Sequence, residues 1–133
     1  MEFQGQLTKF SDLLQRMLES PKIPFRDLKP SSLPATAGVY RILETNALFP
    51  DTVYVGETES FRDRIYGSHL MGNVRVSTLK KKLVRSGRYP NAAGVKAYLR
   101  HDCCLQFIAV SSERDRMRLE HFVVAMLGPY FND

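Results

Sequence analysis

Two short runs, GVYRIL at residues 38–43 and TVYVG at residues 52–56, determine the predicted fold. Both are rich in β-branched and aromatic residues, which predicts two strands. The segment between them contains asparagine, proline and aspartate, which are typical of turns. We therefore expect these two strands to pair as a hairpin with a long connecting loop. On paired strands Tyr40 and Tyr54 can place two hydroxyls in one small space, although tyrosine is also favoured in strands for other reasons.

Apolar spacing predicts the remaining elements. A helix over residues 3–19 is indicated by apolar residues that recur every three or four positions: Phe3, Leu7, Phe10, Leu14 and Met17. Further helices are predicted from Ser60, with Phe61 and Ile65 on one face, from Ser77, over residues 91–101, and from Ser112 to Gly128-Pro129. A third strand over residues 104–110 is mostly apolar, which fits a central, buried position. Residues 20–36 carry four prolines and are predicted to be a connector.

The predicted fold class is α/β (α+β in detail), with a small, mostly antiparallel sheet of three strands flanked by helices. We divide the chain into an N-terminal helix with a proline-rich connector, residues 1–35, and a main domain, residues 36–133. The length of 133 residues favours one core. The N-terminal helix is expected to pack on the main domain or to contact a protein.

Composition favours a globular cytoplasmic protein with a polyanionic partner. The formal net charge is +5 and 44% of the residues are hydrophobic, which suits nucleic acid as a partner and argues against disorder. The two cysteines, Cys103 and Cys104, are adjacent and are read as reduced thiols. No signal peptide is visible at the N-terminus, and no apolar run is long enough for a membrane span.

Glu120 is unusual for its position in the last predicted helix. At 100° per residue it lies beside Val123 and Leu127, at the edge of the apolar face. A carboxylate there loses solvent unless a charged group meets it. That group is either an arginine in an ordinary salt bridge or a metal ion.

The two tyrosine runs, taken together, resemble the paired signature of the GIY-YIG nuclease family. The resemblance continues at Arg64, ten residues after Tyr54, where that family carries an essential arginine. Glu120 matches the family's metal-binding glutamate, and Asn132 matches the asparagine that closes its catalytic module. These elements occur in the expected order over residues 36–133, which makes the set more specific than any one motif.

The resemblance implies a divalent-metal-dependent endonuclease that hydrolyses DNA phosphodiester bonds. Glu120 would hold Mg²⁺ (or Mn²⁺), a hard cation that keeps several waters, so one carboxylate can suffice. Arg64 would brace the phosphate. Tyr40 and Tyr54 would orient or deprotonate the attacking water, and a phenol needs assistance to do this near neutral pH. Asn132 would hold the site together by hydrogen bonds.

Two positions depart from the family pattern. Many members carry a histidine four residues after the arginine, where this chain has Ser68, and His69 comes one residue later. In an α-helix His69 lies 140° from Arg64, so we expect it to reach the site only if Gly67 breaks the helix. Otherwise it is a surface or substrate-contacting histidine. Glu57 stands where some members have lysine, and it is expected to repel phosphate unless neutralised, or to act as an outer-shell metal contact.

Basic residues outside the signature are candidate DNA contacts. Helical geometry alone does not choose between Arg62 and Arg64, and the family spacing favours Arg64. Arg62 is then expected to be solvated or to contact phosphate. A second group lies on the helix from Ser77, with its side chains predicted to point largely outward, and comprises Lys80, Lys81, Lys82 and Arg85, together with Arg75 before it. The alternative is an ordinary solvated helix face. His101 with the two cysteines lacks a recognised zinc-ligand spacing, so zinc is not expected.

Two other functions remain open at this stage. One is a catalytically impaired nucleic-acid-binding module on the same fold, with Glu57 and the displaced His69 as signs of decay. The other is an interaction domain in which residues 1–19 recruit a partner or form a dimer. For the enzyme, we expect DNA cutting that is structure-directed or weakly sequence-specific, because no separate sequence-reading domain is visible.

Overall fold

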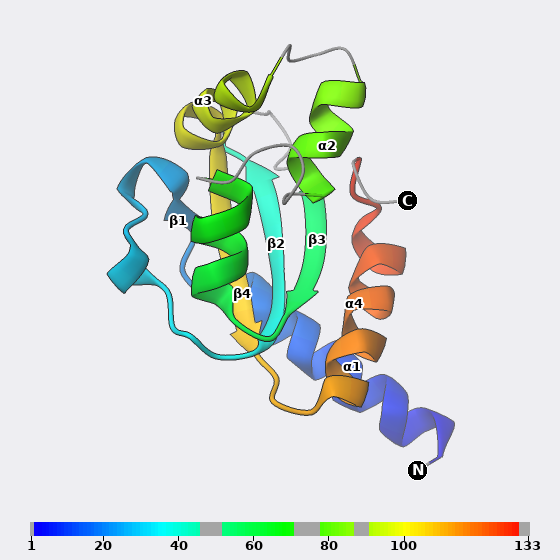
Figure 1. The fold of residues 1–133 in the computed structure, drawn as a ribbon. Coiled ribbons are helices and arrows are strands. Elements are labelled where there is room, and N and C mark those ends of the chain that lie inside the picture. The colour runs from blue at the N-terminus through cyan, green and yellow to red at the C-terminus, as the bar shows by residue number, and fades with distance from the viewer. Residues whose placement is uncertain (1, 46–51, 71–77, 87–90, 131–133) are drawn as a thin grey trace.

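An antiparallel four-stranded sheet lies at the centre of the computed structural model, with the strand order β1-β4-β2-β3 (Figure 1). The structure describes residues 2–45, 52–70, 78–86 and 91–130. The strands are β1 (Ile23–Pro24), β2 (Gly38–Glu44), β3 (Thr52–Thr58) and β4 (Cys103–Ala109). The α+β class with an antiparallel sheet is therefore as expected.

The predicted number of strands was wrong, because β1 forms inside the proline-rich connector. It pairs with β4 through Ile23 opposite Leu105 and Pro24 opposite Cys104. Two residues are too few to show an alternating pattern, and proline is tolerated only because β1 is an edge strand. The connector also contains two short 3₁₀ turns, η1 (Phe25–Asp27) and η2 (Pro30–Ser32).

Helices cover both faces of the sheet. They are α1 (Phe3–Glu19), the π-helix η3 (Arg62–Leu70), α2 (Thr78–Arg85), α3 (Ala92–Asp102) and α4 (Glu113–Leu127). The predicted start and stop of α4 are confirmed. The Ser112 hydroxyl accepts a hydrogen bond from the Asp115 amide at 3.3 Å, and Gly128 ends the helix with a φ of 56°.

Alternation along β2 divides the core into two clusters. Val39 packs with α1 and α4, whereas Tyr40 and Ile42 pack on the opposite face with Phe61 and the residues around η3 and α3. This period of two is what a strand with both faces buried produces. The second face is the one that carries the candidate site.

The N-terminal helix is fastened to the sheet by a buried polar network. Arg41 donates through Nε to the Gln106 side-chain oxygen at 2.8 Å, and through Nη1 to the Thr52 hydroxyl at 2.9 Å. Gln106 in turn donates to the carbonyls of Leu18 at 3.0 Å and Ser20 at 2.7 Å. Because the last carbonyls of a helix have no partners within it, Gln106 satisfies the end of α1.

The two cysteines are free, as expected, and both are buried. Among the residues that the structure describes, we find no helix with the length and apolar character needed to cross a membrane.

Candidate active site

The two tyrosines lie on the same face of the hairpin. Tyr40 is paired with Gly56 and Ile42 with Tyr54, which makes the tyrosines diagonal neighbours across β2 and β3. Their ring centroids are 6.2 Å apart. A Cβ atom on Gly56 would overlap the hydroxyl and ring of Tyr40, so only glycine allows Tyr40 to lie across β3. The predicted convergence of the two phenols is present.

The signature glycine on the other strand has a similar role. A Cβ atom on Gly38 would overlap the Phe61 ring and the Ile108 carbonyl. Phe61 is fully buried, and its amide donates to the Thr36 carbonyl at 3.1 Å. The absence of a side chain at Gly38 therefore lets the Phe61 ring pack against the sheet. Together with the Thr36 hydrogen bond, this contact fixes where η3 begins.

The winding of η3 brings Arg64 and His69 to one side of the helix. In a π-helix the hydrogen bonds run from residue i to i+5, so residues five apart are close to one turn apart. The helix does not break at Gly67, as we had expected it must for His69 to reach the site. Its winding changes instead. As a result Arg64 and His69, five residues apart, are aligned as two residues four apart would be in an α-helix.

His69 is a central member of the site. It is fully buried, and its Nε2 lies 2.5 Å from the Tyr40 hydroxyl oxygen. Its ring also packs edge-on against Tyr54, with centroids 5.3 Å apart. The expectation of a surface or substrate-contacting histidine was wrong, because it assumed α-helical spacing after Arg64.

Burial and neighbouring cations keep His69 neutral. Burial, then Arg64, then Lys80 lower its pKa to about 3. Burial also raises the pKa of Tyr40 well above its usual value, and Tyr54 adds to this, while Arg64 opposes it. Tyr40 is therefore protonated at neutral pH, and it donates to Nε2 when His69 carries its proton on Nδ1.

Arg64 faces both phenols from η3. It is half-buried and is hydrogen-bonded to Tyr40 and Tyr54. Burial acts to lower the pKa of Arg64, but the two tyrosines together raise it. Its guanidinium thus remains charged beside the cluster of site residues formed by Tyr40, Tyr54 and His69.

Arg62 has a different environment. It is exposed, and its Nε donates to the carbonyls of Pro30 at 3.0 Å and Leu33 at 3.1 Å. The structure therefore separates the two arginines that helical geometry alone could not separate: Arg64 lies in the cluster, and Arg62 fastens the connector to η3.

Glu120 approaches the cluster from α4. It is half-buried, and burial followed by the nearby Glu57 carboxylate raises its pKa. The His121 side chain, a hydrogen bond from the Glu57 backbone and the Arg64 guanidinium act in the opposite direction. Glu120 in turn acts electrostatically on both tyrosines. Its carboxylate is thus close to the arginine and the phenols.

Glu57 is neutralised by a residue that the sequence analysis did not identify. Its Oε2 lies 2.7 Å from Nε of Arg116, whose side chain is only 5% exposed. The available signal was the position of Arg116 four residues before Glu120, which puts both side chains on one face of α4. The expected repulsion of phosphate by Glu57 is therefore reduced by an ion pair.

The oxygen donors present suit a magnesium ion. No group of three or more histidine, cysteine or acidic side chains that could hold a metal occurs within residues 2–45, 52–70, 78–86 and 91–130. Glu120, with Glu57 beside it, offers carboxylate oxygens only. Mg²⁺ is commonly held by one or two carboxylates, with waters and substrate phosphates completing its shell. Asn132, the last predicted site residue, lies outside the described residues.

The predicted basic surface on α2 is only partly as expected. Lys80 is 1% exposed, so its predicted outward orientation was wrong: this side of α2 packs towards η3 and α3. Burial, with Lys96 adding to it, lowers the pKa of Lys80 to about 8. Arg85 is exposed at the end of the helix. Arg75 and the side chains of Lys81 and Lys82 lie outside the described residues.

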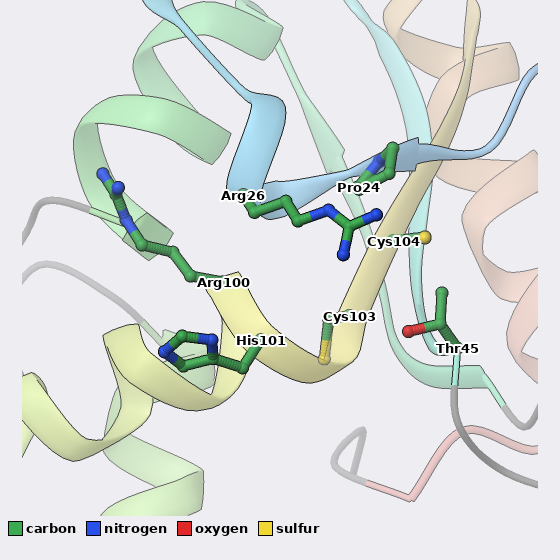
Figure 2. Close-up of a pocket in the computed structure, with 7 residues that line it drawn as sticks. All are labelled: Pro24, Arg26, Thr45, Arg100, His101, Cys103 and Cys104. Carbon is green, nitrogen blue, oxygen red and sulfur yellow. The ribbon is translucent and has the colours of Figure 1, made fainter.

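A pocket lies at the β1 edge of the sheet, away from the two tyrosines (Figure 2). Its lining residues are Pro24, Arg26, Thr45, Arg100, His101, Cys103 and Cys104. The two thiols point in different directions, as adjacent strand residues must.

Comparison of the chain with family models and with curated proteins gave no match. The GIY-YIG resemblance thus depends on the motif residues and on their placement in the fold.

Proposed function

We propose that this chain is a divalent-metal-dependent endonuclease of the GIY-YIG type, with a GIY-YIG-like fold, that hydrolyses phosphodiester bonds in DNA. The observation that supports this most strongly is the convergence of side chains from three separate parts of the chain. Tyr40 and Tyr54 come from the hairpin, Arg64 and His69 from η3, and Glu120 from α4. A core built only for stability does not need two phenols, a guanidinium, an imidazole and a carboxylate in one place.

Arg64 is the proposed phosphate-binding group. Phosphodiester hydrolysis requires an aligned water and compensation of the charge that develops on the phosphoryl oxygens. A guanidinium matches two phosphate oxygens, and Arg64 is held in place by both tyrosines. When held by Glu120, Mg²⁺ would supply Lewis-acid charge neutralisation at the scissile phosphate and the leaving oxygen.

The tyrosines and His69 form the proposed route for the proton of the attacking water. Tyr54 is 6% exposed while Tyr40 and His69 are fully buried, so Tyr54 is the more accessible of the two tyrosines. Tyr54 is hydrogen-bonded to Tyr40, and Tyr40 to His69. As the water attacks phosphorus, Tyr54 takes its proton, Tyr54 passes its own proton to Tyr40, and Tyr40 passes its own to Nε2 of His69. No phenolate has to accumulate.

Substrate binding would make His69 a better acceptor. The positive charge of Arg64 is the second cause, after burial, of its low pKa. A phosphate that pairs with Arg64 offsets that charge, so the pKa of His69 rises when the substrate is in place. The proton route is thereby coupled to occupation of the site.

Sequence preference is proposed to be weak. Arginine and lysine contacts with phosphates position DNA without reading its bases. Arg85 is exposed on α2 and available for such a contact. Preference would then arise from the shape of the substrate, as in flapped or branched DNA.

The test is cleavage of single-stranded, duplex, flapped and branched DNA with Mg²⁺, Mn²⁺ or EDTA. We expect metal-dependent cleavage by the wild-type protein, a loss of about 10²–10³-fold in Arg64→Ala, and a much smaller loss in the matched variant Arg62→Ala. Salt-sensitive DNA binding without cleavage under any condition would refute the enzyme and favour the binding module. Equal losses in the two variants would refute the assigned role of Arg64.

A further inference from the structure

Arg116 is held in place from two directions. Its Nε lies 2.7 Å from Oε2 of Glu57 on β3. Its Nη1 donates to the carbonyls of Ser111 at 3.3 Å and Val110 at 3.5 Å, where β4 leads into α4. Because the Arg116 side chain is 5% exposed and its guanidinium is bonded on both sides, it has little freedom to move.

Glu57 joins Arg116 to Glu120. Its side chain receives the Arg116 guanidinium, and its backbone N–H donates to the Glu120 carboxylate. Arg116 and Glu120 are four residues apart on α4 and share one helix face. One face of α4 therefore contacts Glu57 of β3 at two points. These two contacts fix the position of Glu120 along the strand.

A purely structural ion pair would explain this contact but not its position. Buried ion pairs often add little to stability, because desolvation offsets their attraction. Here the acidic member is close enough to Glu120 to act on it electrostatically. A negative charge at that place favours a cation on Glu120, and the positive charge of Arg116 limits that effect.

We infer that Arg116 and Glu57 form a positioning pair that sets the divalent-metal affinity of Glu120. Glu57 strengthens cation binding by its charge and orients Glu120 through its backbone. Arg116 holds Glu57 in place and moderates its charge. The inference rests on the proposed function, in which Glu120 is the metal ligand.

The pair makes two predictions of opposite sign. Glu57→Gln removes a negative charge while keeping a hydrogen bond to Arg116, so metal affinity falls. Arg116→Gln leaves the Glu57 carboxylate without its counter-charge, so metal affinity rises. We expect shifts of about threefold or more in each direction, since one unit charge changes at short range. A merely structural pair would lower stability in both variants and leave the affinity of the folded protein unchanged.

The experiment is a titration of the full chain with Mn²⁺ without DNA, followed by electron paramagnetic resonance of the free ion. The variants are Glu57→Gln, Arg116→Gln and Glu120→Ala, with Arg114→Gln as a control because Arg114 is exposed on the same helix. Thermal melts followed by circular dichroism establish that each variant is folded. We expect Arg116→Gln to bind Mn²⁺ more tightly than the wild type. Arg114→Gln should bind it as the wild type does, and Glu57→Gln should bind it more weakly.

The outcomes separate the inference from the proposed function. Binding that is lost in Glu120→Ala but unchanged in Glu57→Gln and Arg116→Gln overturns the positioning pair and leaves the metal site intact. Wild-type binding that does not depend on Glu120 overturns the proposed metal site itself. Should Arg116→Gln fail to fold, the double variant Glu57→Gln/Arg116→Gln replaces it. Its opposite charge effects should cancel, so an affinity as low as that of Glu57→Gln would contradict the inference.

Discussion

At the scale of single residues, the site combines a neutral imidazole with a protonated phenol. Burial acts on both groups in the direction that removes charge, so it lowers the pKa of His69 and raises that of Tyr40. The motif spacing predicted the tyrosines and Arg64. It could not predict the place of His69, because that depends on a change of helical winding, or the partner of Glu57, because Arg116 is distant in sequence.

The low pKa of His69 makes the stability of the protein depend on pH. Its pKa is about 3 in the folded chain and about 6.5 when unfolded. Between these values the unfolded chain binds the extra proton, so the free energy of unfolding falls as pH decreases from about 6.5 towards 3. We expect the stability advantage of wild type over His69→Gln to shrink through this range in urea-unfolding measurements.

The control is the same pair of proteins above pH 7, where neither the folded nor the unfolded chain protonates His69 and the two curves should run parallel. A His69→Gln curve that is also parallel to the wild type between pH 6.5 and pH 4 would show that His69 is not buried in its neutral form.

At the scale of elements, η3 is the segment that sequence patterns describe least well. Sequence patterns placed α1, α3 and α4 and the three longer strands, each of which is seven residues or longer. The predicted buried pair, Phe61 just before η3 and Ile65 within it, is present, but a spacing of four does not reveal the i→i+5 winding of Arg62–Leu70. Gly67 does not relieve a close contact, since the nearest atom to an added Cβ is 4.0 Å away.

The π-winding can be tested by changing the spacing between Arg64 and His69. Deleting Gly67 shortens the spacing to four, which an ordinary α-helix aligns on one face. We expect this variant to keep cleavage within about tenfold, and insertion of an alanine after Gly67 to cost about 10²-fold or more, because misplaced catalytic groups lose rate steeply. Single-turnover cleavage rates measure both, and a deletion as harmful as the insertion would contradict the account.

At the scale of the whole molecule, α1 is part of the fold and not an appended tail. Phe10, Leu14 and Met17 are buried in the cluster formed with β2, β3, β4 and α4. The apolar stripe correctly indicated these three, but it also included Phe3 and Leu7, which are 74% and 40% exposed. The N-terminal part of α1 extends past the other elements (Figure 1), and a sequence pattern does not show where the covering surface ends.

Neighbouring residues of α1 provide a test of this packing. Met17 is fully buried and Leu18 is 36% exposed. Met17→Ala should lower the free energy of unfolding by about 2–5 kcal/mol, because it removes buried atoms and leaves a cavity. Leu18→Ala should have a much smaller effect, and chemical denaturation compares the two. Equal small effects would mean that α1 contributes little to the stability of the domain.

The central claim is that the residues gathered around Tyr40 hydrolyse phosphodiester bonds with a metal ion held by Glu120. The most direct measurement is the single-turnover rate of DNA cleavage with Mg²⁺ for wild type, Glu120→Gln and the control Glu113→Gln, whose glutamate is exposed at the start of the same helix. We predict metal-dependent cleavage by wild type and Glu113→Gln, with none detectable in Glu120→Gln. Cleavage by Glu120→Gln at the wild-type rate would contradict the claim.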